Sequence, residues 1–327
     1  MGKTTILLLL LFALLLTTSL SKDLCHKDDK NTLLKIKKAM NDPYTIISWD
    51  PKDDCCTWYS VECGNANRVT SLDLSDDDVS AQIPPEVGDL PYLQYLTFRK
   101  LPNLTGEIPP TIAKLKYLKS LWLSWNSLTG PVPEFLSQLK NLQYIDLSFN
   151  DLSGSIPGSL SLLPKLEILD LSRNKLTGSI PESFGSFKGV MYALFLSHNQ
   201  LSGSIPKSLG NLDINQIDLS RNKLEGDASM LFGAQKTTHN IDLSRNMFQF
   251  NISMVKVSKT VNFLHLNHNG LTGTIPIQWT QLDLQIFNVS YNRLCGRIPQ
   301  GGELQRFDAY AYLHNKCLCG APLQSCK

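Results

Sequence analysis

Aspartates recur at one position of a repeated motif in this chain, and paired carboxylates can do chemistry. A glycoside hydrolase needs two such groups, one acting as general acid and the other as base or nucleophile. Asp218 and Asp242, which stand 24 residues apart, could form such a pair. The same aspartate, however, also occupies the equivalent positions Asp73, Asp146 and Asp170. It therefore forms a column of a repeat, and we do not expect a catalytic dyad.

Other enzyme signatures are missing from the chain after residue 21. It contains no G-x-S-x-G, H-E-x-x-H, P-loop or G-x-G-x-x-G motif. His265 and His268 are three residues apart, but the first is expected on a strand and the second in a turn, so they do not predict a metal site. We expect a protein that is not an enzyme, with no catalytic residue, no metal site and no cofactor.

The repeated motif is clearest as "DLSRNKLTGSIP" from Asp170 to Pro181, with close copies elsewhere such as "DLSFNDLSGSIP" and "FLSHNQLSGSIP". Its asparagine recurs at steps of 23 to 26 residues, with Asp77 in the same slot of a degenerate first copy. The asparagines are Asn103, Asn126, Asn150, Asn174, Asn199, Asn222, Asn246, Asn269 and Asn292. The template L-x-L-x-x-N-x-L-x-G-x-I-P matches a leucine-rich repeat of the plant extracellular type, present in ten copies.

Each letter of the template has a structural role. Leu169 and Leu171 alternate as on a strand and point inward, so the residues beside them face solvent. Asn174 can satisfy backbone groups of adjacent turns, Gly178 permits a conformation that a Cβ would obstruct, and Pro181 ends the segment. We predict an α/β solenoid: a curved, right-handed leucine-rich repeat superhelix of ten repeats, with a parallel β-sheet on its concave face and disulfide-bonded caps.

The two ends of the chain differ from the repeats. Lys3 followed by the apolar run 6–16 predicts a secretory signal peptide over residues 1–21, with a membrane anchor as the alternative. We expect an N-terminal cap over 22–66, in which "DDKNTLLKIKKAM" forms a helix with a solvated basic face. The repeats then occupy 67–300, and a C-terminal cap occupies 301–327.

The eight cysteines form two clusters separated by 231 residues. A secreted chain favours disulfides over zinc ligands. Spacing alone permits three pairings in each cluster, and we expect the sequential one. The pairs would be Cys25 with Cys55, Cys56 with Cys63, Cys295 with Cys317, and Cys319 with Cys326.

Two copies depart from the template. The second, "TFRKLPNLTGEIP", holds two extra residues between strand and asparagine, which predicts a bulge around Arg99 to Pro102. The eighth, "DLSRNMFQFNISM", lacks the G-x-I-P segment. Such departures indicate either a bend or a functional site.

The outward strand positions mix acids with the exposed aromatics Trp122 and Phe195, as a protein-binding face would. A second column, one residue before each asparagine, includes Arg173, Arg221 and Arg245. These arginines either neutralise the neighbouring acids or bind an external anion. The net charge of +2 does not indicate a nucleic-acid partner.

The frame C-x(29)-C-C-x-W-x-x-V-x-C from Cys25, the ten repeats and the ending "NRLCGRIPQGGELQRFDAYAYLHNKCLCGAPLQSC" together resemble the plant polygalacturonase-inhibiting proteins. The resemblance implies a secreted plant cell-wall protein that blocks endo-polygalacturonases of fungi and insects with its concave face. Some members of the family also contact pectin through basic residues. The alternatives are a ligand-binding co-receptor, since plant receptor ectodomains share the repeat, and an ice-binding protein, since a close relative of the family became one.

These considerations assign candidate residues. The expected contacts with the enzyme are Tyr144, Asp146, Asp170, Phe195, Gln216, Asp218, Asp242 and His265. Pectin is expected on Arg173, Arg221 and Arg245. N-x-S/T sequons predict glycosylation at Asn103, Asn251 and Asn288. We expect a monomer that has no membrane anchor.

Overall fold

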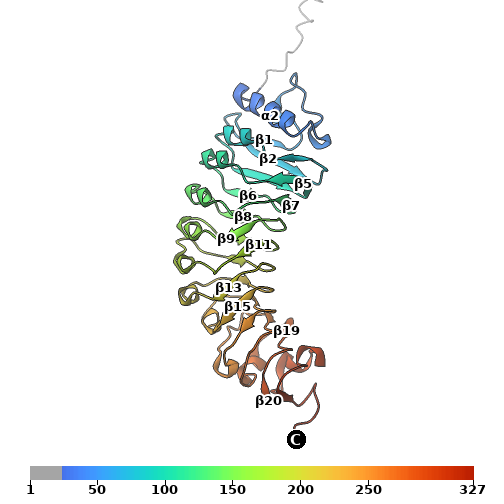
Figure 1. The fold of residues 1–327 in the computed structure, drawn as a ribbon, viewed down its shortest axis with the longest axis vertical. Coiled ribbons are helices and arrows are strands. Elements are labelled where there is room, and N and C mark those ends of the chain that lie inside the picture. The colour runs from blue at the N-terminus through green and yellow to red at the C-terminus, as the bar shows by residue number, and fades with distance from the viewer. Residues whose placement is uncertain (1–23) are drawn as a thin grey trace, which may run out of the picture.

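The computed structural model describes residues 24–327, and the expected signal peptide lies outside them. The chain forms a curved stack of coils running from helix α2 (Lys27–Ala39) to strand β20 (Cys295–Arg297) (Figure 1). Each repeat coil contributes a strand to the concave side and a short 3-10 turn to the convex side (Figure 1). The predicted leucine-rich repeat fold is confirmed. Within 24–327, no helix has the length and hydrophobicity needed to cross a bilayer.

One sheet of eleven strands lines the concave side. All its pairings are parallel except that of β1 with β2, and the register places Leu169 beside Ile145 and Leu194. Consecutive coils therefore align residue for residue. The strands in spatial order are β1 (Val61–Cys63), β2 (Val69–Ser75), β4 (Tyr95–Arg99), β6 (Ser120–Trp122), β8 (Tyr144–Asp146), β10 (Ile168–Asp170), β12 (Ala193–Phe195), β14 (Gln216–Asp218), β16 (Asn240–Asp242), β18 (Phe263–His265) and β19 (Ile286–Asn288).

Shorter sheets follow the turn after each concave strand. They contain β3 (Ala81–Gln82), β5 (Leu101–Gly106) and β7 (Asn126–Leu128); β9 (Ser153–Ser155) and β11 (Lys175–Thr177); β13 (Ser202–Ser204), β15 (Lys223–Gly226) and β17 (Met247–Phe248); and β20 with β21 (Cys317–Cys319). The 3-10 turns are Tyr44–Ile46, Cys55–Thr57, Pro85–Asp89, Pro110–Lys114, Glu134–Gln138, Gly158–Leu162, Glu182–Ser186, Lys207–Asn211, Ser229–Leu231, Ile252–Met254, Ile277–Gln281, Gly302–Gln305 and Ala309–Ala311.

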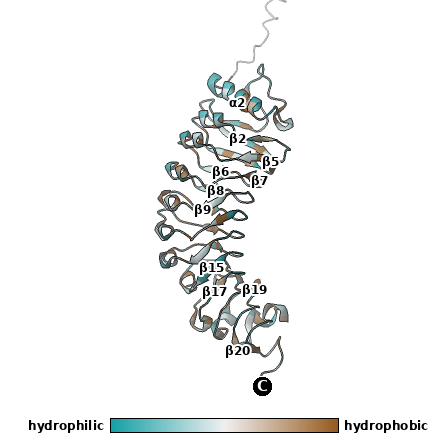
Figure 2. Ribbon diagram, in the orientation of Figure 1, coloured by the Kyte–Doolittle hydropathy of each residue, from teal (hydrophilic) through white to brown (hydrophobic). Residues whose placement is uncertain are grey.

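The core is a single continuous stack of leucines and other apolar side chains, which recur from coil to coil (Figure 2). Leu169 and Leu171 are fully buried, as the template predicts, and Phe184 and Phe187 return to the core from the convex side. Gly178 has φ +77°, while a Cβ there would make only ordinary contact with Ser155, at 3.6 Å. The glycine is therefore needed for its left-handed backbone and not for space.

The template asparagines bridge successive coils. The Asn174 Oδ1 atom accepts a hydrogen bond from the Leu152 N–H of the preceding coil at 3.0 Å. Its Nδ2 donates to the Leu171 carbonyl of its own coil at 3.1 Å and to the Leu147 carbonyl of the preceding coil at 3.0 Å. Asn150, Asn199 and the later copies repeat this pattern, which we call the asparagine ladder. The ladder satisfies buried backbone groups, as predicted.

The prediction that Asn103 belongs to this ladder is wrong. Strand β4 extends to Arg99, Lys100 adopts the left-handed conformation at φ +54°, and the asparagine slot then falls on buried Leu101. Asn103 is exposed two residues later. The register of β5 shifts between Leu101 and Thr105, so the two extra residues do form a bulge, reaching slightly beyond the expected segment.

The ladder also continues further than the sequence template indicates. Asn315, in the C-terminal cap, accepts from the Leu294 N–H at 3.0 Å and donates to the carbonyls of Val289 and Tyr312 at 3.0 and 2.8 Å. At the other end, the Asp77 carboxylate accepts from the Thr45 N–H at 3.0 Å. At each end, the residue in the asparagine slot therefore joins a cap to the repeats: Asp77 at the N-terminal end and Asn315 at the C-terminal end.

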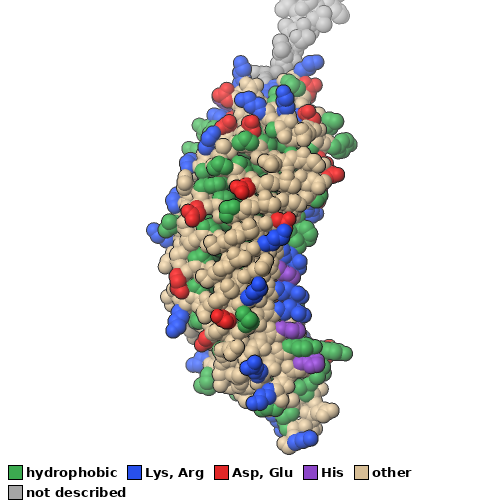
Figure 3. All heavy atoms as spheres, viewed as in Figure 1, with side chains coloured by type: hydrophobic (Ala, Val, Ile, Leu, Met, Phe, Trp, Pro, Cys, Tyr) green, Lys and Arg blue, Asp and Glu red, His purple; other side chains and the backbone are tan. Residues whose placement is uncertain are grey.

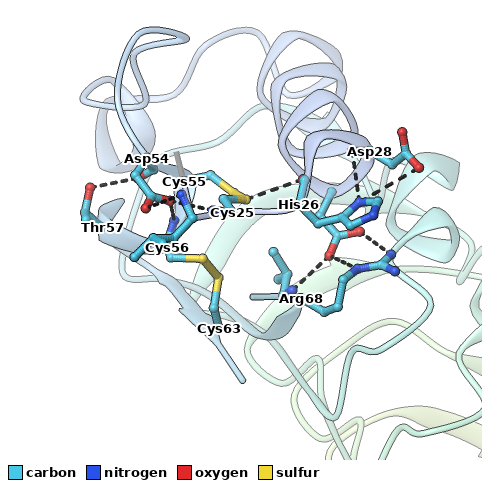
Figure 4. The surroundings of a disulfide bond; sticks show 12 residues. Cys25, His26, Asp28, Asp54, Cys55, Cys56, Thr57, Cys63 and Arg68 are labelled. Carbon is cyan, nitrogen blue, oxygen red and sulfur yellow. Dashed lines mark hydrogen bonds and ion pairs between the residues drawn. A yellow bond between two sulfur atoms is a disulfide. The ribbon is translucent and has the colours of Figure 1, made fainter. Parts of the chain in front are cut away.

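The caps are closed by disulfides in the expected sequential order, Cys25–Cys55, Cys56–Cys63, Cys295–Cys317 and Cys319–Cys326. In the N-terminal cap the buried Asp29 carboxylate, carried by α2, accepts from Arg68 Nε at 2.9 Å and Nη2 at 2.7 Å, and from the Val69 N–H at 2.9 Å. Figure 4 shows Arg68 beside the two disulfides of this cap. A fully compensated buried ion pair therefore fixes the helix on the first coil.

We predict that Asn174→Ala lowers the free energy of unfolding by about 1 to 3 kcal/mol, because it leaves buried backbone groups of two coils without partners. Asn103→Ala is the matched control, since Asn103 is exposed and lies outside the ladder. Urea denaturation of the unglycosylated proteins measures both changes. Equal stability of Asn174→Ala and the control would contradict the structural role of the ladder.

Candidate protein-binding face

Two straight columns of side chains cover the concave face. The strand column holds the last residue of each three-residue parallel strand of the large sheet and its equivalents in the longer ones: Asp73, Thr97, Trp122, Asp146, Asp170, Phe195, Asp218, Asp242, His265 and Asn288. The turn column holds the residue three positions further on, namely Asp76, Lys100, Trp125, Phe149, Arg173, His198, Arg221, Arg245, His268 and Tyr291, and it ends with His314 of the C-terminal cap. Because the pairing is in register, neighbours in a column belong to adjacent coils.

The acids of the strand column have a structural role that the sequence did not reveal. Asp218 Oδ1 accepts a hydrogen bond from the Ser220 N–H at 2.9 Å, closing the turn at the end of its strand. Asp146, Asp170 and Asp242 bond in the same way to the serine two residues on. Asn288 makes the equivalent bond to Ser290 at 2.9 Å. Either a carboxylate or an amide oxygen can therefore close the turn, so the turn does not need a charge at this position.

The turn column has a left-handed backbone, with φ between +53° and +60° from Trp125 to His314. Its planar side chains stack between coils: the ring centroids are 3.6 Å apart for Trp125 and Phe149, and 4.1 Å apart for His268 and Tyr291. The Arg173 guanidinium lies 4.8 Å from the centroid of Phe149. The column is therefore a nearly continuous row of rings and guanidinium groups.

The arginines of this row do not neutralise the neighbouring acids. Within residues 24–327, no ion pair joins Arg173, Arg221 or Arg245 to a carboxylate. In Figure 3, basic and histidine side chains gather along the concave margin of the lower half of the stack. Both columns therefore present charge to a partner.

The two columns enclose a hollow of about 600 Å³ over coils five to ten. It brings together most of the predicted residues: Asp170, Arg173, Phe195, Asp218, Arg221, Asp242, Arg245 and His265. His198 and Asn288 also line it, although neither was predicted as a partner contact. His198 could have been predicted as a residue of this site, because it stands in the same column as the arginines.

Three predicted contacts lie outside the hollow, at its edge. Asp146 is adjacent to Asp170 in the sheet. The Tyr144 hydroxyl donates to Glu167 Oε2 at 3.2 Å, and Gln216 Nε2 lies 3.5 Å from the Tyr192 hydroxyl. These residues share the concave face with the hollow but do not line it.

Burial and neighbouring charges shift the pKa values in the hollow. Burial raises the pKa of Asp170 to about 6, and the nearby Asp146 and Asp218 add to this effect. Burial also acts upward on the pKa of Asp242, but hydrogen bonds from His265 and Ser244 outweigh it and lower that pKa. The hollow therefore holds one carboxyl group that titrates in mildly acidic solution and one that stays ionised.

Two histidines of the turn column, His198 and His268, have lowered pKa values. Burial lowers the pKa of His198, and the flanking Arg173 and Arg221 lower it further. The pKa of His268 is lowered by burial and by Arg245. These two histidines therefore favour the neutral form, and the arginines supply positive charge to the hollow.

The predicted glycosylation sites differ in accessibility. Asn103 and Asn251 are exposed. Asn288 is half-buried in the hollow, and its Oδ1 accepts from both the N–H and the Oγ of Ser290. A glycan attached to the Asn288 Nδ2 atom would occupy part of the hollow.

Family models and similar proteins agree with this architecture. A leucine rich repeat N-terminal domain matches residues 26–64, and a leucine rich repeat model matches 116–176 and 164–224. The chain is 73% identical to polygalacturonase inhibitor 2 of Arabidopsis thaliana over 100% of both chains. It is 63% identical to a polygalacturonase inhibitor of Pyrus communis, covering 99% of this chain and 98% of that protein. Among solved structures, a plant ice-binding protein superposes with a TM-score of 0.91 at 53% identity, covering 93% of this chain and 99% of the other.

We predict that Asp170→Asn flattens the pH dependence of stability. Folding raises the pKa of Asp170 from 3.8 to about 6, so the folded protein binds more protons than the unfolded chain between these values. The wild type should therefore lose stability as the pH rises from about 4 to about 6. Asparagine keeps the bond to Ser172 and removes this titration.

Urea denaturation between about pH 4 and pH 7 measures the effect, and the variant should be the more stable protein at the upper end of this range. Ser202→Ala, an exposed substitution that does not titrate, should keep the wild-type profile. A variant profile parallel to that of the wild type would show that Asp170 keeps an ordinary pKa.

Proposed function

The chain belongs to the family of plant polygalacturonase inhibitors, which are not enzymes, and we propose that it stops endo-polygalacturonases by covering their substrate cleft with its concave face. The observation that carries this proposal is the hollow, where the charges of both columns surround the partly buried ring of Phe195. Among these charges in residues 24–327, only Asp242 and His265 form an ion pair. An interface of this kind combines charge complementarity with an aromatic anchor.

The acids of the strand column are suited to an enzyme that acts on a polyanion. Such an enzyme lines its cleft with lysine and arginine, which would face Asp170, Asp218 and Asp242. In residues 24–327 the Oδ2 atom of Asp218 makes no hydrogen bond, because only its Oδ1 closes the turn. Complementary charge of this sort mainly sets the rate and register of encounter.

Tight binding would also need side chains that lose their water on contact. Phe195 lies between Asp170 and Asp218 in the sheet and is only partly buried. Gln216 starts the next strand, and Tyr144 lies on the same face. We therefore assign Phe195, Gln216 and Tyr144 as anchors, with Asp146 and His265 at the ends of the charged stretch.

We predict that combining Asp170→Asn, Asp218→Asn, Phe195→Ala and Gln216→Ala abolishes inhibition of a susceptible polygalacturonase. The asparagines keep the turn acceptors, so the substitutions of Asp170 and Asp218 leave their turns closed. Alone, Asp218→Asn should slow association, and Phe195→Ala should speed dissociation by about five- to 150-fold, corresponding to about 1 to 3 kcal/mol.

Surface plasmon resonance at two salt concentrations separates the two rates, and reducing-sugar release measures inhibition. Lys207→Gln, on the convex side, serves as the control. Full inhibition by the quadruple variant would place the contact elsewhere on the molecule.

We further propose that Arg173, Arg221 and Arg245 bind pectin. They follow one another in the turn column with His198 between the first two, and no carboxylate of residues 24–327 neutralises them. A chain of uronates lying along this row would displace counterions, as other polyanions do.

Pectin binding should therefore weaken steeply with added salt, and Arg221→Gln combined with Arg245→Gln should reduce both the affinity for de-esterified pectin and the salt slope. The matched control is Lys207→Gln combined with Lys223→Gln, which removes the same charge away from the hollow. Co-sedimentation with pectin over a salt series measures both. Unchanged affinity in the arginine variant would contradict this assignment.

Extracellular location follows from the family, and we propose the plant cell wall as the compartment, with glycans on Asn103 and Asn251 in preference to Asn288. The ice-binding protein shares this fold, so the fold does not choose between the two activities. The bulky and charged side chains of the strand column favour a protein partner, because ice binding needs a regular array of small polar groups.

A further inference from the structure

An aromatic patch occupies the concave face next to the hollow. It consists of Tyr95, Trp122, Trp125, Tyr144 and Phe149, carried by β4, β6 and β8 and the turns that follow β6 and β8. Tyr95, Trp122 and Trp125 are exposed by 44%, 41% and 46%. We call this group the aromatic platform.

Trp122 stands at the strand-column position that is an aspartate in five other coils. In the next coil Asp146 Oδ1 accepts from the N–H and Oγ of Ser148 at 2.9 and 2.6 Å. Trp122 replaces that aspartate, and the Oγ of Ser124 is left buried without a partner in the described chain. An unsatisfied buried hydroxyl destabilises the fold, and Trp122 itself remains 41% exposed. Trp122 thus removes the turn acceptor without a structural gain, and this indicates that the residue is kept for function.

Trp125 is held in the platform in a costly way as well. It has φ +60°, a conformation that bulky residues rarely adopt, and it stacks on Phe149 with the ring centroids 3.6 Å apart. The Arg173 guanidinium continues the stack at 4.8 Å from Phe149. The platform is thus preorganised and continuous with the hollow at Arg173, so a partner seated in the hollow would reach it.

We propose that the aromatic platform is a second contact area for the polygalacturonase, which takes an apolar patch of the enzyme surface beside its cleft. This inference rests on the proposed function. A protein surface fits the platform better than a sugar, because Trp125 and Phe149 cover each other's inner faces and a sugar ring stacks on open faces. Exposed, rigid tryptophans bordering a charged contact are typical of interface hot spots.

The test uses Trp122→Asn and Trp125→Asn on the full chain. Asparagine at 122 restores the turn acceptor that Asn288 provides in the tenth coil, so the melting temperature should stay the same or rise. Asparagine at 125 suits the left-handed backbone. The double variant should bind a susceptible enzyme at least about tenfold more weakly, mainly through faster dissociation.

Tyr310→Ser, which removes an exposed aromatic residue of the C-terminal cap, is the control and should keep wild-type rates. Wild-type dissociation rates in the double variant would overturn this inference alone, because the hollow would then carry the binding. A lower melting temperature of Trp122→Asn would contradict the argument that the tryptophan is kept at the expense of stability. A wild-type protein that binds no enzyme in a panel of fungal polygalacturonases would overturn the proposed function, and this inference with it.

Discussion

The asparagine ladder is the constraint on which the rest of this molecule depends. Each ladder side chain bonds to the backbone of its own coil and of the preceding one, as Asn174 does with Leu171 and Leu147. It holds consecutive turns at the same point of the coil and satisfies polar groups that a buried bend would leave open. Adjacent coils cannot slip relative to each other without breaking several buried hydrogen bonds. The side chains on the concave face therefore form straight columns.

The same short segment that ends each strand also presents the binding groups. In coils such as that of Asp218, one carboxylate oxygen closes the turn and the other faces outward. The residue before the asparagine then adopts a left-handed backbone and carries Arg221 into the second column. Structure and recognition are therefore coupled at this position. Substituting asparagine for aspartate separates them, since asparagine supplies the acceptor without the charge.

The concave face is uneven along the stack, and this asymmetry suits a bulky partner. Coils five to ten carry unpaired charges of both signs around the hollow, whereas coils two to four carry stacked or exposed rings. Charges guide the approach of a partner, and desolvated rings slow its departure. The two regions meet where Arg173 lies against Phe149, so they act as parts of one surface.

The sequence by itself determined the repeat, the leucine core and the two columns. These features follow from the periodicity of the chain, since each copy of the repeated motif predicts the same pattern. Tertiary structure alone decided that Leu101 and not Asn103 fills a ladder slot, that Asn315 extends the ladder, and that Asp146 lies outside the hollow. It also revealed the unpartnered hydroxyl of Ser124. Each of these depends on which atoms of different coils meet, and that is set by register and turn geometry, which the spacing of residue types does not encode.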